Sequence, residues 1–262
     1  MNKRQLFNIS RLVDETTKEV PIETSFVEDF NYCICNINKS NSLPSPTYKP
    51  SGFNCIRKMY YERVETPLDE QNTSPELIAI GETGTDRHLR IQNVVSKMKS
   101  CGIDCEYVDV EDYVNTHDLP DLKIIGKSEF ETKLHNTKYN LNFLCDGIIK
   151  YKGTYYILEI KTESSYKWRE QTGIMPEHLN QATLYSMCFN IPQVLFLYES
   201  RDFLSKKCYI TTITQEQIQN VINTINQCEE CVKVHIPPNK PENITNKICQ
   251  YCGYRKTCRK DR

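Results

Sequence analysis

The sequence lacks the features that would assign it to a membrane or to the secretory route. No run of apolar residues approaches the roughly 18 that a membrane-spanning helix needs. The N-terminus begins with basic residues but has no continuous apolar stretch after them, so we do not expect a secretory signal. The sequence has no internal repeat. These absences predict a cytoplasmic, globular protein without membrane partners.

The sequence also has no excess of positive or negative charge. The chain of 262 residues has 33 basic and 34 acidic side chains, for a formal net charge of −1. Proteins that coat nucleic acid are strongly basic, so this balance argues against such a role but permits a local basic groove. A hydrophobic content of 39% with 26% charged residues is ordinary for a globular protein and is enough for a sizeable core.

Cysteine, in contrast, is abundant, with 13 residues. In a reducing compartment, thiols are metal ligands or buried side chains more often than disulfides. Near the end of the chain, Cys249, Cys252 and Cys258 have the spacing of a metal knuckle for zinc or for an iron–sulfur cluster. Such a site needs a fourth ligand, and Cys55, far upstream, is one candidate.

Hydrophobic periodicity and turn signals predict an alternation of helices and strands. Residues 1–50 are polar and mixed, and we interpret them as an N-terminal extension to a domain over 51–262, which closes with a cysteine-rich tail over 236–262. We expect helices over 74–100 and 176–189 and from 214 onward, and strands over 127–134, 141–150, 154–161, 194–200 and 207–213. The order favours an α/β fold of the α+β type, with a mixed sheet flanked by helices.

Charged residues interrupt the most strand-like stretch of the sequence, FLCDGIIKYKGTYYILEIKT, at Asp146, Glu159 and Lys161. Side chains alternate along a strand, so Glu159 and Lys161 share one face, and Asp146 can face Glu159 across the hairpin. Facing carboxylates repel each other unless a cation lies between them, and Mg²⁺ or Mn²⁺ prefers such hard oxygen ligands. The alternative interpretation is an edge hairpin with solvated charges.

Other candidate residues lie on the expected helices. His88 follows Gly84 by one turn on the apolar face of the first helix, where it is either a ligand or a satisfied core histidine. Gln181 and Tyr185, four residues apart, either present an amide and a phenol to a phosphate or are ordinary surface and core residues. Two acidic residues on the preceding expected strand are expected at most to support the metal ligands, namely Glu129 and Glu131.

In this order, G-T-D-R-H (84–88), C-D-G (145–147), L-E-I-K-T (158–162) and Q-A-T-L-Y (181–185) resemble the motifs of RecB-like nucleases in the PD-(D/E)XK superfamily. The resemblance implies a restriction-endonuclease-like αβββαβ core. It also implies that Mg²⁺ or Mn²⁺ is held by His88, Asp146, Glu159 and the carbonyl of Ile160. Lys161 would act with Asp146 and Glu159 in catalysis by positioning the attacking water. Two residues would hold the DNA backbone, namely Gln181 and Tyr185.

The cysteine pattern, one early residue and a late C-x2-C-x5-C, resembles the iron–sulfur nucleases of the CRISPR-associated and AddB types. This resemblance implies a 4Fe-4S cluster that staples the ends of the nuclease domain through Cys55, Cys249, Cys252 and Cys258. The competing interpretation is a zinc ribbon that combines Cys228 and Cys231 with the two cysteines of the C-x2-C pair. Cys228, however, falls on the apolar face of its helix and fits the core more easily.

Together these patterns predict a metal-dependent DNA exonuclease that hydrolyses phosphodiester bonds at single-stranded ends. We expect it in DNA processing, recombination, repair, or phage- or CRISPR-related pathways, where protein partners in a recombination, replication or CRISPR complex are conceivable. The alternatives are a non-catalytic DNA-binding subunit of such a complex, in which the acidic site would be broken, and a zinc-ribbon regulator. The acidic pair, the lysine and the histidine are all present, which favours the enzyme.

Overall fold

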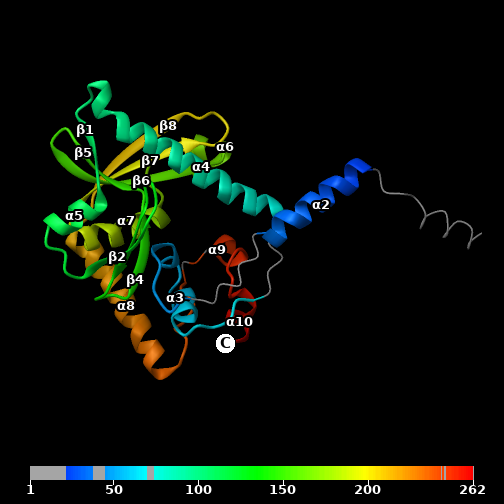
Figure 1. Cartoon of the computed structure of the whole chain (residues 1–262). Coiled ribbons are helices and arrows are strands. Elements are labelled where there is room, and N and C mark those ends of the chain that lie inside the picture. The colour runs from blue at the N-terminus through cyan, green and yellow to red at the C-terminus, as the bar shows by residue number, and fades with distance from the viewer. Residues whose placement is uncertain (1–21, 38–44, 70–73, 243, 245, 262) are drawn as a thin grey trace, which may run out of the picture. The chain divides into compact units, whose positions relative to one another are not determined.

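A computed structural model describes residues 22–37, 45–69, 74–242, 244 and 246–261 (Figure 1). The chain divides into two compact units, residues 1–41 with 72–82 and residues 42–71 with 83–262. In the smaller unit, helix α2 (Ile22–Ile37) has no buried residue. The long helix α4 (Pro75–Lys97) starts in the smaller unit and continues into the larger one. No described helix has the length and apolar character that crossing a membrane requires.

A five-stranded mixed sheet is the centre of the larger unit, with strand order β1-β5-β6-β7-β8. Only β6 and β7 pair in parallel; the other neighbours are antiparallel. The chain crosses from β6 to β7 through α7, as a parallel pair requires. The expected mixed sheet is confirmed, and the order α4, β1, β5, β6, α7, β7 is compatible with a nuclease core. The strand bounds are Cys105–Val108 (β1), Gly147–Tyr151 (β5), Thr154–Glu163 (β6), Gln193–Ser200 (β7) and Lys206–Thr212 (β8).

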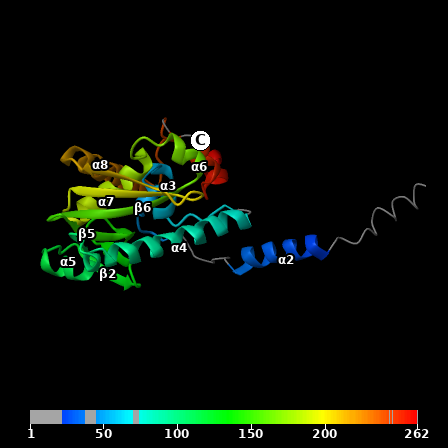
Figure 2. The same ribbon diagram turned by 90° about the horizontal axis from the view of Figure 1, so that it is seen from above.

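Helices cover both faces of this sheet, because its strands are apolar on both faces. On one face, Ile91 and Val95 of α4 pack with Leu158 and Ile160 of β6. On the other face, Ile157 and its neighbours pack with two helices, α7 (Pro176–Phe189) and α8 (Gln215–Val234) (Figure 2). Both helices agree closely with the expected ranges. Smaller elements of the larger unit are Pro50–Gly52 (η1), Ile56–Arg63 (α3), Lys99–Cys101 (η2), Val110–Thr116 (α5), Ser165–Glu170 (α6), Asn246–Gln250 (α9) and Arg255–Lys260 (α10).

A second, three-stranded sheet has the order β2-β3-β4, with bounds Leu122–Lys127, Thr132–Asn136 and Leu141–Cys145. It changes two expectations from the sequence. Half of the strand expected over 127–134 is the connection between β2 and β3, since residues 128–131 are outside both. The strand expected over 141–150 is two strands, because β4 pairs in this sheet and β5 in the larger one. The chain changes sheets at Asp146.

Tyr107 of β1 fixes this change of sheet. Its hydroxyl lies 2.7 Å from the carbonyl oxygen of Asp146 and 3.0 Å from that of Phe130, so the two carbonyls share its single hydrogen. The backbone of Gly147 passes so close to the phenol that a Cβ there would lie 2.6 Å from its oxygen. Gly147 also has a φ of +155°. The glycine of the C-D-G motif is therefore required by the break between the strands.

Replacement of Gly147 by alanine should reduce the free energy of unfolding by about 2 kcal/mol or more, because the rigid phenol and the backbone cannot both keep their places. Equilibrium unfolding in urea measures the change. Gly81→Ala is the matched control, since a Cβ on this helical residue meets nothing within 4 Å and alanine is the better helix former. Equal stability of Gly147→Ala and the wild type would show that the break tolerates a side chain.

The two ends of the larger unit lie side by side (Figure 1). Tyr48 forms a bridge with Leu141 and is 1% exposed, so the packed unit begins before residue 51. Arg57 on α3 donates to the carbonyl oxygen of Asp261, and the Asp261 carboxylate accepts from Tyr61. These contacts place the C-terminal cysteines against α3.

Candidate active site

The charged residues of β6 face α7, on the opposite side of the strand from Leu158 and Ile160. Gly147 pairs with Leu158, so Asp146, one residue earlier, lies beside Glu159. An Asp146 carboxylate oxygen, Oδ2, accepts a 2.7 Å hydrogen bond from the Ile160 amide. This bond holds the carboxylate at the end of the hairpin, where β5 leaves the sheet. Whether the Ile160 carbonyl is a metal ligand remains a prediction.

Helix α4 brings His88 to the same place. His88 Nδ1 lies 3.1 Å from Asp146 Oδ1, and one turn later Gln92 Nε2 donates to the Asp146 carbonyl oxygen at 2.7 Å. Burial of the imidazole opposes its protonation, but the hydrogen bond and charge of Asp146 outweigh this and raise the pKa of His88. His88 Nδ1 and Asp146 Oδ1, both of which could bind a metal ion, therefore point at each other.

A chain of polar contacts runs from β6 to α7. Lys161 Nζ lies 2.5 Å from Glu159 Oε1 and forms an ion pair with this buried oxygen. The same ammonium donates to Gln181 Oε1 at 3.0 Å, and Gln181 Nε2 donates to the Tyr185 oxygen at 2.8 Å. Gln181 is partly exposed, whereas Tyr185 is 3% exposed within the core. Of the two residues expected to hold DNA, Gln181 is thus the more accessible.

Glu131 joins this group, although it was expected at most to support the ligands. One donor atom each of His88, Glu131 and Asp146 lies within 4.8 Å of the other two. Burial and the Asp146 charge both raise the pKa of Glu131. Glu131 lies in the connection between β2 and β3 and Glu129 is exposed there. No local pattern distinguishes the two, because the position of Glu131 depends on the break at Asp146.

These donors fit a divalent cation. Carboxylate oxygens and an imidazole nitrogen suit Mg²⁺ or Mn²⁺, and His88, Glu131 and Asp146 supply them close together. The Glu159 carboxylate, 1% exposed, is not part of this close group, and its Oε1 pairs with Lys161. Burial and repulsion by Asp146 raise the pKa of Glu159 to about 7, although Lys161 opposes the shift. A cation near the two carboxylates would remove this repulsion.

Glu159 should make the stability of the metal-free protein depend on pH. Its pKa rises from 4.5 in the unfolded chain to about 7 in the folded one, so between these values the folded state binds more protons. The free energy of unfolding should therefore fall as the pH rises from about 4.5 to about 7. Urea unfolding in EDTA across this range should show the decrease in the wild type and a smaller one in Glu159→Gln, which cannot ionise. An identical decrease in both proteins would rule out Glu159 as its origin.

An ionic cluster around a buried glutamate attaches α4 to β7 beside this site. Glu199 is fully buried, and Arg90 donates to both of its carboxylate oxygens at 2.6 Å. Arg87 donates to Glu199 Oε1 and to the carbonyl oxygen of Arg201, and Lys206 lies 3.1 Å from Oε2. Arg87 precedes His88, so the cluster holds the part of α4 that carries the histidine. The sequence analysis did not identify it.

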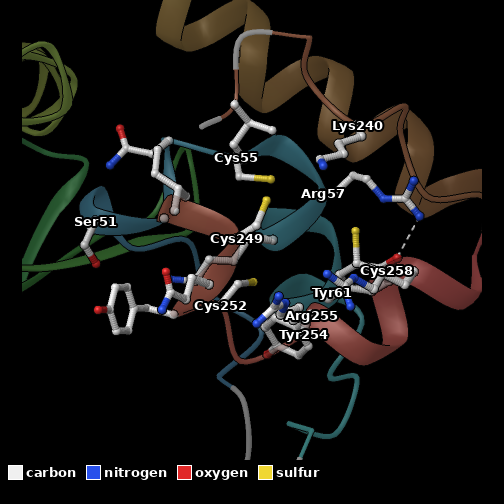
Figure 3. A pocket seen from close by; sticks show the side chains of 18 residues that line it. Ser51, Cys55, Arg57, Tyr61, Lys240, Cys249, Cys252, Tyr254, Arg255 and Cys258 are labelled. Atoms are coloured by element: carbon white, nitrogen blue, oxygen red, sulfur yellow. Dashed lines mark hydrogen bonds between the residues drawn. The ribbon is translucent and has the colours of Figure 1, made fainter. Parts of the chain in front are cut away.

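A second set of residues gathers at the ends of the larger unit. A cavity of about 860 Å³ is lined by Cys55 before α3, Cys249 on α9, Cys252 in the following turn and Cys258 on α10. Figure 3 shows their sulfur atoms around one hollow. Burial, together with the charges of Cys252 and Cys258, raises the pKa of Cys55. The proposed cluster ligands therefore share one cavity.

The cysteines of the alternative zinc ribbon are not all gathered around this cavity. Cys228 and Cys231 do not line the cavity, and Cys228 is fully buried in the core on α8. The structure thus brings together the set with Cys55 and does not bring together the zinc-ribbon set.

Comparison with known proteins finds structures that share the fold, but it assigns the chain to no family. No protein-family model matches the chain, and no curated protein matches its sequence. The crystal structure of SSO0001 aligns with a TM-score of 0.50 over 90% of this chain and 98% of that one, at 16% identity. This likeness shows a shared fold.

The solved structures that align with the chain also include an alkaline exonuclease, LHK-Exo from Laribacter hongkongensis. It aligns with a TM-score of 0.46 at 12% identity, over 73% of this chain and 90% of that one. The same exonuclease in complex with dAMP aligns with a TM-score of 0.44, again at 12% identity and over the same shares.

Proposed function

We propose that this chain is a metal-dependent DNA nuclease, and more narrowly an exonuclease that acts on single-stranded ends. The observation that carries the proposal is the convergence of His88, Asp146, Glu159 and Lys161 where β5 leaves the sheet. The site combines a buried carboxylate of raised pKa, a second carboxylate beside it and a lysine in contact with the first. Perturbed groups of this kind gather at catalytic sites more often than elsewhere.

The metal ligands in this proposal are His88, Asp146, Glu159 and the carbonyl of Ile160, with Mg²⁺ or Mn²⁺ as the cation. When bound, such a cation neutralises charge on the phosphate and lowers the pKa of a coordinated water. Glu131 is close enough to His88 and Asp146 to add a ligand. The amide of Ile160 and the side chain of Gln92 hold Asp146 in place for this role.

Lys161 orients the attacking water in this mechanism. Its ammonium, partly buried, contacts Glu159 on one side and Gln181 on the other. Burial opposes its charge, but Glu159 raises the pKa of Lys161 above its ordinary value, so the side chain stays protonated at neutral pH. It therefore serves as a hydrogen-bond donor and a positive charge. In the proposed pair of Gln181 and Tyr185, the partly exposed amide of Gln181 would contact the DNA backbone, and the buried Tyr185 would hold that amide in place.

The cysteines form a separate, structural site in the proposal. Cys55, Cys249, Cys252 and Cys258 would hold a 4Fe-4S cluster, since thiolates prefer iron and zinc to magnesium and these sulfur atoms spread around one cavity. Such a cluster would join segments that already meet through Arg57 and Asp261. Its contribution is to the stability of the nuclease unit and not to hydrolysis.

The test of the proposed function is a cleavage assay on end-labelled single- and double-stranded DNA with Mg²⁺, Mn²⁺ or EDTA. We expect release of short products from single-stranded ends that depends on the metal and stops in EDTA. A covalently closed single-stranded circle should survive, because it has no end. A chain that binds these DNAs and cleaves none of them would instead be a non-catalytic subunit of a DNA-processing complex.

A further inference from the structure

His178, on the first turn of α7, is a polar side chain of the site that the proposed mechanism does not use. It shares a helix face with Gln181 and Tyr185, which follow it by three and seven positions. Its Nδ1 lies 2.9 Å from the hydroxyl oxygen of Tyr198, a fully buried residue on β7. The ring is itself only partly buried.

The surroundings of Tyr198 determine which imidazole nitrogen carries the hydrogen. The amide of Met175 donates to the Tyr198 oxygen at 3.4 Å, so the phenol still has its own proton to donate. Among the residues that the structure describes, His178 Nδ1 is the only acceptor in contact with that hydroxyl. We infer that Nδ1 accepts from the phenol, so that the hydrogen of the neutral ring lies on Nε2.

Nε2 is left available as a donor. It forms no hydrogen bond with any described residue, and it is not among the buried polar atoms that lack a partner, so it reaches solvent. Burial and the positive charges of Lys161 and Lys167 lower the pKa of His178 to about 3. The ring thus stays neutral beside two cations. The phenol of Tyr198 disfavours the tautomer that carries the hydrogen on Nδ1.

We propose that His178 is a substrate-binding residue, whose Nε2–H donates to a phosphate oxygen of the DNA strand next to the one held by Gln181. The inference rests on the proposed nuclease function and extends it by one contact. A neutral donor suits this position, because Lys161 and Lys167 already supply the positive charge. Tyr198 acts as a positioning residue that sets the tautomer.

Two substitutions separate this role from a purely structural one. In His178→Gln, the amide nitrogen takes the place of Nε2 and keeps a donor toward solvent. In His178→Asn, the shorter amide keeps an acceptor for Tyr198 but has no donor that reaches as far. Binding of a fluorescein-labelled single-stranded oligonucleotide in EDTA, where no cleavage occurs, gives the affinity. Thermal unfolding of each variant checks that it is folded.

We expect His178→Gln to bind within about twofold of the wild type and His178→Asn to bind about tenfold more weakly. The slope of log affinity against log salt should stay unchanged in both, whereas Lys167→Gln should reduce it by about one, since only a cation releases counterions. The reverse order of the two histidine variants would show that His178 serves only Tyr198, and equal affinities would exclude the contact. A wild type that fails to bind would overturn the nuclease proposal itself.

Discussion

Asp146→Asn is expected to abolish DNA cleavage, with a fall in rate of about 10³-fold or more, while leaving the chain folded. Asparagine still offers an oxygen to the Ile160 amide, so the local hydrogen bond survives. What is lost is the negative charge that faces His88 and lies beside Glu159. The same substitution therefore removes the charge of a proposed cation ligand and its ion pair with His88, while it keeps the hydrogen bond to Ile160.

Steady-state cleavage of end-labelled DNA under saturating Mg²⁺ measures the effect, and circular dichroism checks the fold. Asp104→Asn is the matched control. Asp104 is exposed in the turn before β1, so this variant should cleave DNA at the wild-type rate. The cleavage rate of Lys161→Ala should be as low as that of Asp146→Asn, because the substitution removes the ammonium beside Glu159. Wild-type rates for either site variant would mean that this group is not the catalytic centre.

The parts of the fold that were predictable from the sequence are those whose signals are local. Helix α7 begins at Pro176, which suits a first turn, and α8 begins after Thr214, whose side chain forms the predicted capping box with Gln217. Strand β6 begins with apolar and aromatic residues and then has charged residues at alternate positions, which is typical of a strand. In each case the residues that decide the structure are neighbours in the sequence.

The break at Asp146 could not be predicted in this way. The sequence around it has the pattern of one apolar strand. Buried residues alternate in β4 and are successive at the start of β5. The cause of the break is Tyr107, from a strand of only four residues that the sequence analysis did not identify. The proximity of Glu131 to His88 and Asp146 was not predictable for the same reason, since it follows from the break.

The cysteines show the opposite situation, in which residues far apart in the sequence were grouped by their chemistry alone. Their chemistry is distinctive enough that spacing and resemblance selected Cys55 and the C-terminal cysteines together, and the structure places them around one cavity. The burial of Cys228 on the core face of α8 was also expected from its position in the helical pattern. What the sequence could not supply is the path of the chain, which brings α3 against α10 through Arg57, Tyr61 and Asp261.

Cys55→Ser should remove the cofactor and destabilise the nuclease unit. Anaerobically purified wild type should be brown and absorb near about 400 nm, as thiolate-bound iron–sulfur clusters do, and the variant should lose most of this absorbance. A cluster between Cys55 and the C-terminal cysteines closes most of the unit into a loop. If it restricts the unfolded chain as a covalent cross-link does, its loss lowers the free energy of unfolding by about 4 kcal/mol. Activity should fall as a consequence of that instability.

Cys208→Ser is the control, because Cys208 is exposed on β8 and does not line the cavity, so colour and stability should match the wild type. Iron and zinc analysis of the same samples decides the identity of the metal. A colourless wild type with one zinc per chain, lost on replacement of Cys231 but not of Cys55, would establish the ribbon instead. Retention of full iron by Cys55→Ser would contradict the staple. The proposed active site lies where β5 leaves the sheet and on β6 and α4, whereas the cysteines lie on or next to α3, α9 and α10. Loss of the cluster should therefore not alter the metal dependence of the cleavage that remains.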